Sequence, residues 1–192
     1  FLKGRCRYCR APVSIQYPAV ELLTASAFIL CLLSKGPGMG SAIMCMFSGI
    51  LITAAFIDAR HMYIPDGIHV LILLLSCISL AAGSAPSLMN RLGGSLLTGG
   101  FLALVNLLSR GGVGWGDVKL FAASGLLIGA APAMTALLMG YVTAGLWYAV
   151  PLLRGRVGRK TQIPMAPFFA VSLMICGLWF RQLLLWYLGF FR

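Results

Sequence analysis

The sequence predicts an all-α fold, a polytopic transmembrane helical bundle of about seven spans. Two observations carry this prediction. First, 60% of the 192 residues are hydrophobic and only 10% are charged, against roughly 45–50% apolar and 25% charged residues in an ordinary soluble domain. Second, apolar runs of about 15–25 residues recur from Pro18 to the C-terminus, near the length that crosses a hydrocarbon core. A soluble globular protein is therefore excluded.

Seven apolar runs follow one another, and in lipid each must be helical to satisfy its own backbone polar groups. Stretches rich in Gly, Pro and Ser at residues 36–40, 83–86 and 111–116 separate several of them. Pro132 makes the connection between the fifth and sixth runs very short. The predicted spans are residues 18–34, 41–57, 67–83, 93–109, 117–131, 132–153 and 166–190.

The positions of the basic residues predict the orientation of the bundle. The chain has 15 Lys and Arg against 4 Asp and Glu, a net charge of +11. With seven spans, eleven basic residues fall on the side of the N-terminus: Lys3, Arg5, Arg7, Arg10, Arg60, Arg110, Lys119, Arg154, Arg156, Arg159 and Lys160. Lys35, Arg91 and Arg192 fall on the other side, and Arg181 lies inside the last span. The positive-inside rule therefore places the N-terminus in the cytoplasm.

Clusters of this kind are typical of topology signals and of contacts with anionic headgroups. We therefore expect the lipid bilayer, and no nucleic acid, as the partner of this basic charge. Residues 1–17 are interpreted as a cytoplasmic segment with one Cys-x-x-Cys pair, Cys6 and Cys9, and residues 18–192 as one transmembrane domain. The first residue is Phe rather than Met, which favours a preceding segment over the alternative of a naturally short form. Packing inside apolar runs is predicted for the other thiols: Cys31, Cys45, Cys77 and Cys176.

The four carboxylates are the most informative residues, because ionisable groups at a membrane boundary are costly and often functional. Asp58 ends the second predicted span and Asp117 opens the fifth, both on the cytoplasmic side. Asp66 follows Pro65 at the start of the third span, a helix N-terminal position that needs no chemistry. Glu21 is a possible intramembrane partner for a basic residue.

Two carboxylates that share a partly dry site cannot both ionise comfortably, so one keeps a proton. The charged member can deprotonate a water that attacks an amide carbonyl, and the protonated member can assist the leaving amine. Glycines at positions 111, 112, 114 and 116 permit the close approach of an extended peptide. The alternative is that Asp58 and Asp117 are helix caps or partners of Arg60 and Lys119.

Other polar residues are given structural roles. His61 and His69 have no companion at metal-ligand spacing, so we expect them to be solvated or to cap helices. Lys119 either tunes Asp117 electrostatically or extends toward lipid headgroups, and we favour the second interpretation.

Taken together, these residues resemble the bacterial type IV prepilin peptidases, a family of aspartic membrane proteases with a Gly-x-Gly-Asp signature. The resemblance covers most of the chain and rests on four motifs in order: residues 4–14 with 17–24, Asp58 with 64–66, residues 114–120, and residues 162–167. It implies that Asp58 and Asp117 are the catalytic pair and that Asp66 is not catalytic. It also implies cleavage of prepilins or pseudopilins after the glycine that ends a short basic leader, at the cytoplasmic face of the inner membrane.

The sequence departs from the family in its N-terminal region. Family members commonly carry an earlier helix and a second Cys-x-x-Cys, and their four cysteines resemble a tetrahedral zinc site. Cys6 and Cys9 are half of such a site, so structural zinc requires further ligands, and the alternative is two unliganded thiols. No cofactor is expected for proteolysis. The residues associated with N-methylation in the family lie upstream, so methyl transfer is not expected here.

Two other functions remain as alternatives at this point. Carboxylates at membrane depth also build proton pathways, so a proton-coupled transporter or channel that uses Asp58 and Asp117 as a relay is the main rival. No inverted repeat supports it, and a purely structural subunit leaves the paired Asp motifs without a role. For the peptidase, we predict that both carboxylates reach one water and that the second and fifth spans are neighbours.

Overall fold

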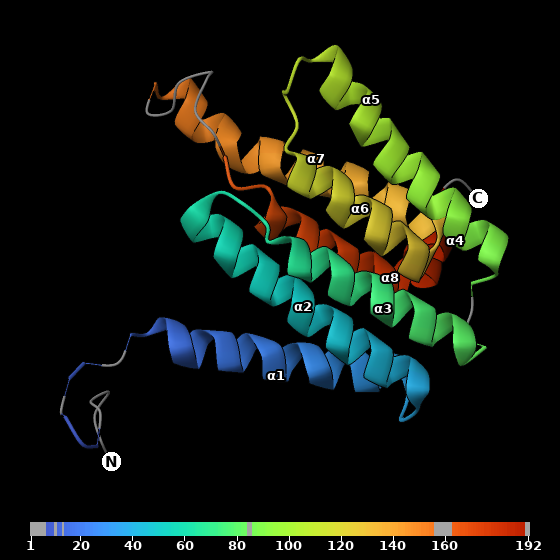
Figure 1. The fold of residues 1–192 in the computed structure, drawn as a ribbon, viewed down its shortest axis with the longest axis horizontal. Coiled ribbons are helices and arrows are strands. Elements are labelled where there is room, and N and C mark those ends of the chain that lie inside the picture. Colours follow the sequence, from blue (N-terminus) through green and yellow to red (C-terminus); the bar gives the residue numbers. More distant parts are fainter. Residues whose placement is uncertain (1–6, 10, 13, 84–85, 156–162, 191–192) are drawn as a thin grey trace.

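The computed structural model describes residues 7–9, 11–12, 14–83, 86–155 and 163–190. Within these residues the fold is helical, without a strand, as the sequence predicts (Figure 1). The elements are α1 (Gln16–Lys35), α2 (Met39–His61), α3 (Asp66–Ala81), α4 (Leu88–Ser95), η1 (Leu96–Gly100), α5 (Phe101–Leu108), α6 (Trp115–Ile128), α7 (Ala130–Leu153) and α8 (Ala166–Gly189). Since α4, η1 and α5 follow one another as one 21-residue rod, the described chain forms seven rods. Each predicted span corresponds to one of them.

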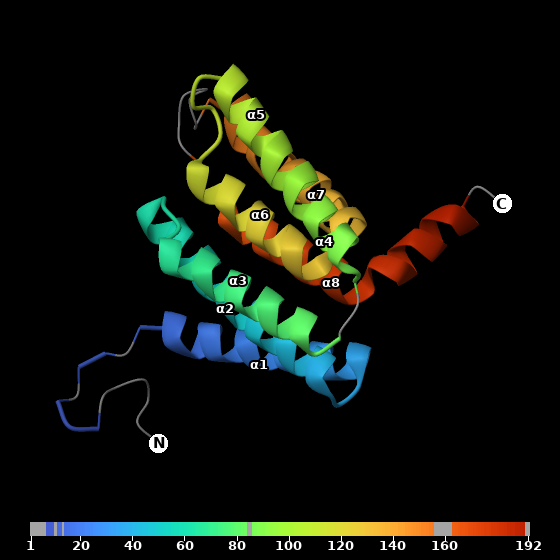
Figure 2. The same ribbon diagram turned by 45° about the vertical axis from the view of Figure 1, so that its right-hand side comes forward.

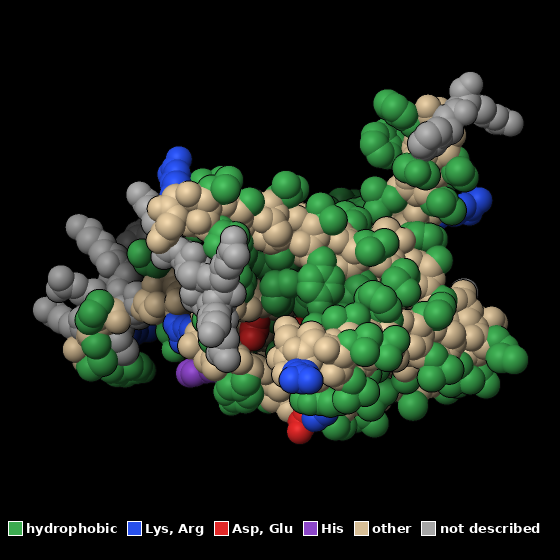
Figure 3. All heavy atoms as spheres, turned by 90° about the horizontal axis from the view of Figure 1, so that it is seen from above, with side chains coloured by type: hydrophobic (Ala, Val, Ile, Leu, Met, Phe, Trp, Pro, Cys, Tyr) green, Lys and Arg blue, Asp and Glu red, His purple; other side chains and the backbone are tan. Residues whose placement is uncertain are grey.

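The dimensions and surface of the bundle suit a membrane. Five rods are long enough and apolar enough to cross a bilayer: α1, α2, the α4–α5 rod, α7 and α8. In the face seen in Figure 3, hydrophobic side chains are spread over the whole length of the bundle and charged groups are few. Cys31 and Cys176 are buried as expected, whereas Cys77 is exposed, which corrects the expectation that it packs inside. The chain is a multi-pass membrane protein.

Helix α6 lies within the bundle and packs along α3, α4 and α7. Its contact with α4 is so close that a Cβ atom on Gly94 would lie 2.5 Å from the Gly125 carbonyl oxygen. Next to this contact, the buried Thr98 hydroxyl of η1 donates to the Phe121 carbonyl at 3.0 Å. Small residues and interhelical hydroxyl bonds of this kind hold helices together in lipid, where the hydrophobic effect does not.

Arg91 lies inside the bundle, although the sequence places it in a connection between spans. It is 1% exposed, and α4 begins before it, at Leu88. Its guanidinium donates to the Pro86 carbonyl (2.9 Å), the Leu126 carbonyl (3.2 Å) and the Ser79 hydroxyl (2.9 Å). The positive charge therefore satisfies groups near the C-terminal ends of α3 and α6, where the helix dipole favours a cation.

Helix α8 bends at Trp179, whose backbone (φ −123°, ψ 17°) is not helical. The Ser34 hydroxyl of α1 donates to the Leu178 carbonyl at 3.2 Å. A side chain that bonds to a backbone carbonyl within a helix is a common cause of a kink. Figure 2 shows the last turns of α8 pointing away from the other helices.

Candidate active site

A cavity of about 720 Å³ opens at the end of the bundle where α2 ends and α3 and α6 begin. Asp58 and Asp117 both line it, as the sequence predicts. The remaining lining residues come from the α2–α3 connection, the glycine-rich loop before α6, helix α7 and the segment before α8: Met62, Tyr63, Ile64, Gly111, Gly112, Val113, Gly114, Trp115, Gly116, Tyr141, Ile163 and Met165. The fold thus brings together two carboxylates that lie far apart in the sequence.

Asp58 is held in place by the start of α8. It is 7% exposed, and its Oδ2 accepts the Ala166 backbone N–H at 2.9 Å. Ala166 is the first residue of α8, so the carboxylate lies at a helix N-terminus, where the macrodipole favours negative charge. The capping alternative is therefore correct in part. Asp58 accepts the first backbone N–H of α8, at Ala166, which lies 108 positions later in the sequence.

Asp117 lies in the first turn of α6 and is half-buried. The Asp58 carboxylate and the Tyr141 phenol lie near enough for electrostatic coupling with this carboxyl group. Within the described part of the chain, neither aspartate forms an ion pair with Arg60 or Lys119, because the ion pairs found there belong to Asp66. The two carboxylates therefore line one cavity, and among the described residues no ion pair neutralises either one.

Lys119 binds Asp66 rather than extending freely toward headgroups. Its Nζ lies 2.6 Å from Asp66 Oδ1, and this ammonium lowers the pKa of the exposed Asp66 carboxyl, which lies outside the spanning segments. The pair joins the start of α3 to the start of α6. Asp66 begins α3, as predicted, and does not line the cavity.

His69 is the site residue that sequence reasoning missed. We expected a solvated or capping side chain, but it is 5% exposed. Its Nε2 lies 3.0 Å from the carbonyl oxygen of Gly116, the residue before Asp117, and its Nδ1 lies 3.6 Å from Asp66 Oδ1. His69 lies three residues after Asp66, which places both side chains on one face of α3. This spacing is the sequence signal from which the role of His69 could have been predicted.

Replacing His69 by Ala is expected to slow substrate turnover by roughly 10–100-fold, because the backbone before Asp117 loses its anchor and a shift of about 1 Å in a catalytic group can cost 10²-fold. His69→Gln, which can still hydrogen-bond the Gly116 carbonyl, should restore most of the rate. His61→Ala is the control, since His61 is exposed at the same end. Equal rates for His69→Ala and wild type in a peptide-cleavage assay would refute the positioning role.

Asn106 of α5 holds the glycine-rich loop before α6. It is a second residue near the site that the sequence analysis did not predict. Asn106 is 3% exposed, and its amide donates to the Val113 carbonyl (2.7 Å) and accepts from Trp115 Nε1 (3.2 Å). Gly111 has φ +95°, a conformation that favours glycine. A Cβ on Gly116 would lie 3.4 Å from Ile64 Cβ, so the small residue also lets α6 begin close to the α2–α3 connection.

The prediction that the second and fifth spans are packed neighbours is wrong for the described residues. Helix α2 packs along α1, α3 and α8, whereas α6 packs along α3, α4 and α7. Helix α3 therefore contacts both, and the two aspartates come together at the end of the bundle. The spacing of the two Asp motifs along the sequence could not predict that α3 packs between α2 and α6.

Of the two predicted zinc ligands, the structure describes only Cys9, which does not line this cavity. Cys9 is exposed and free, and Cys6 lies outside the described residues. In the described ranges, no three His, Cys, Asp or Glu side chains gather to hold a metal ion. Two thiolates fill half of a tetrahedral site, so the residues present do not complete a zinc centre. Zinc at Cys6 and Cys9 stays a prediction that requires further ligands.

The fold and the cavity define a class: a polytopic helical membrane protein with paired carboxylates at one end of the bundle. Comparison with known families is consistent with this. Residues 45–149 match the model described as the type IV leader peptidase family, and residues 1–35 match the bacterial peptidase A24 N-terminal domain. The chain belongs to the type IV leader peptidase family.

Curated relatives match over most of the chain. A protein of Aeromonas hydrophila named prepilin leader peptidase/N-methyltransferase is 33% identical over 98% of this chain and 67% of its own length. A Bacillus subtilis protein of the same name is 30% identical, with 98% and 76% covered. An Escherichia coli O78:H11 type 4 prepilin-like proteins leader peptide-processing enzyme is 38% identical, with 89% and 64% covered. No solved structure shows a significant match.

Proposed function

We propose that this protein is a membrane-embedded aspartic endopeptidase that removes the short basic leader from prepilins or pseudopilins, after the glycine that ends the leader. One observation carries the proposal: in a chain of the leader peptidase family, Asp58 and Asp117 line one cavity. A proton relay would use the same pair, but family membership favours the peptidase over a transporter or channel.

In the proposed reaction, one carboxylate acts as the base and the other as the acid. Asp58 is assigned the charged role, because its carboxylate accepts the Ala166 N–H at the start of α8. It takes a proton from the water that attacks the carbonyl carbon of the scissile peptide. Asp117 holds a proton, donates a hydrogen bond to the carbonyl oxygen and transfers the proton to the leaving amine.

The open side of the cavity suits an extended peptide. Gly111, Gly112 and Gly114 line it and are exposed, so a substrate backbone can approach without meeting side chains. Large hydrophobic residues lie close by, among them the exposed Trp115 and Tyr63. The apolar residues that follow the leader of a pilin precursor would therefore meet an apolar rim.

The proposed location is the inner membrane, with the active site on the cytoplasmic side. Four described cations lie near the cavity end of the bundle, at the ends of α2, α5 and α7 and the start of α6: Arg60, Arg110, Lys119 and Arg154. The positive-inside rule assigns this end to the cytoplasm. The basic leader would be cut there, before the pilin leaves the membrane.

The test is cleavage of a prepilin-like peptide by the purified protein in detergent, with products identified by mass. We expect one cut, after the leader glycine, and no cut in a matched peptide that has Val at this position. Proton flux through liposomes that contain the protein is measured in parallel. Flux without peptide cleavage would contradict the proposal and favour the relay. Adding S-adenosylmethionine to the same reaction tests the expectation that the new N-terminus gains no methyl group.

A further inference from the structure

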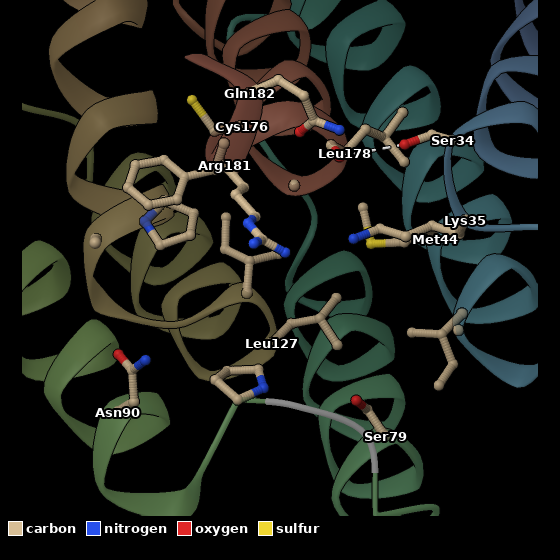
Figure 4. A pocket seen from close by; sticks show the side chains of 18 residues that line it. Ser34, Lys35, Met44, Ser79, Asn90, Leu127, Cys176, Leu178, Arg181 and Gln182 are labelled. Atoms are coloured by element: carbon tan, nitrogen blue, oxygen red, sulfur yellow. Dashed lines mark hydrogen bonds between the residues drawn. The ribbon is translucent and has the colours of Figure 1, made fainter. Parts of the chain in front are cut away.

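A second cavity, of about 590 Å³, lies at the opposite end of the bundle from the two aspartates (Figure 4). It is bordered by the end of α1, the starts of α2 and α7, the ends of α3 and α6, and α8 around its bend. None of its lining residues is acidic. The proposed peptidase chemistry does not use this cavity.

The cations at this end of the bundle gather around the cavity. Lys35, the last residue of α1, and Arg181, just after the bend in α8, both line it, and Figure 4 shows their side chains pointing into it from different walls. A third cation, the buried Arg91, donates to the Ser79 hydroxyl in the wall. Within the described chain, these are the Lys and Arg residues of this end.

No carboxylate of the described residues balances this charge. Asp58, Asp66 and Asp117 lie at the other end, and Glu21 lies in the second turn of α1, far along the helix from Lys35. Three cations around a cavity without an acidic residue produce a positive potential that attracts an anion.

Polar and apolar groups in the walls define the kind of anion. The Asn90 side-chain oxygen accepts the Ala130 N–H at 2.9 Å, which leaves the amide nitrogen of Asn90 as a donor beside the cavity. Gln182 supplies a second amide. The other walls are apolar and include Ile43, Met44 and Leu127. Donors and cations beside an apolar wall suit an amphiphile with an anionic head.

We propose that this cavity binds the phosphate of an anionic phospholipid, with Lys35 and Arg181 on the phosphate and the apolar wall along the first part of the acyl chains. Free phosphate has the same head chemistry, and the apolar wall favours the lipid. The bend in α8 is part of the site, because the Ser34 bond to the Leu178 carbonyl turns the helix just before Arg181.

The test is thermal unfolding of the purified protein in neutral detergent during titration with phosphatidylglycerol. We expect the lipid to raise the midpoint in a saturable manner and phosphatidylcholine to have a much smaller effect. The double variant Lys35→Gln with Arg181→Gln should need roughly 25-fold more phosphatidylglycerol, since each of the two basic residues contributes about 1 kcal/mol near an anionic surface, close to fivefold. Both side chains are exposed, so the variant is expected to fold.

The matched control removes the same charge at the other end, in the double variant Arg60→Gln with Arg154→Gln, and should titrate as wild type does. Equal titrations of all three proteins would overturn the site. If inorganic phosphate alone reproduced the shift at the same concentrations, the ligand would be the free anion and the lipid assignment would be wrong. The readout does not depend on peptide cleavage, so it is independent of the proposed function.

Discussion

Replacing Asp58 or Asp117 by Asn should abolish leader cleavage, each by roughly 10²–10⁴-fold, the range that general acid–base groups contribute. Asn keeps the shape of Asp but neither takes a proton from water nor gives one to the leaving amine. Because both residues line one cavity and the proposed mechanism uses them as one acid–base unit, the double variant should be little worse than either single variant. The measurement is the initial rate of peptide cleavage at saturating enzyme.

Asp66→Asn is the matched control for these variants. It removes the same charge at the same end of the bundle, but Asp66 is exposed and outside the cavity. An Asn oxygen at this position can still accept from Lys119, so the rate should fall by less than about tenfold, well below the general acid–base range. Thermal unfolding of all variants reports whether the fold is intact. Full activity of a folded Asp58→Asn or Asp117→Asn protein would rule out the catalytic pair.

Replacing Arg91 by Leu should lower the free energy of unfolding by about 3 kcal/mol or more. The Pro86 carbonyl and the Ser79 hydroxyl would lose the Arg91 donor, and the Leu126 carbonyl would keep only the Ser76 hydroxyl. Each buried polar group left without a partner costs about 1–3 kcal/mol. Lys would not reproduce these bonds. The planar guanidinium of Arg donates in several fixed directions at once, whereas the single ammonium of Lys cannot reach groups on three segments. The measurement is reversible unfolding in mixed micelles.

Arg154→Leu provides the comparison for Arg91. Arg154 is exposed just after α7, so its replacement should change stability by no more than about 0.5 kcal/mol. Similar stability losses for the two variants would show that Arg91 does not hold the ends of α3 and α6 together.

The sequence predicted the helical rods and the two aspartates for simple reasons. A rod in lipid needs an uninterrupted apolar run, so composition alone places it, and Asp58 and Asp117 stand out because carboxylates are rare in this chain. His69, Asn106 and Arg91 could not be placed in the same way. Their roles depend on carbonyls brought to them by other segments, such as Gly116 for His69, and a backbone acceptor leaves no mark in the sequence.

The packing order of the helices was unpredictable for a related reason. Apolar periodicity is weak when a rod meets lipid on one side and protein on the other, because both neighbours are apolar. The position of α3 against both α2 and α6 depends on side-chain fit, including the small Gly116 beside Ile64. Such fit appears only when the segments are brought together in space.

The bend at Trp179 divides α8 into two segments. The first segment begins at Ala166, whose backbone N–H holds Asp58, and the second carries Arg181 and the exposed terminal turns. Because the backbone at Trp179 is not helical, we expect tilting of the second segment with the membrane surface to exert little torque on the first. The Asp58 carboxylate would then be insulated from changes in bilayer thickness and curvature that act on the far end of the same helix.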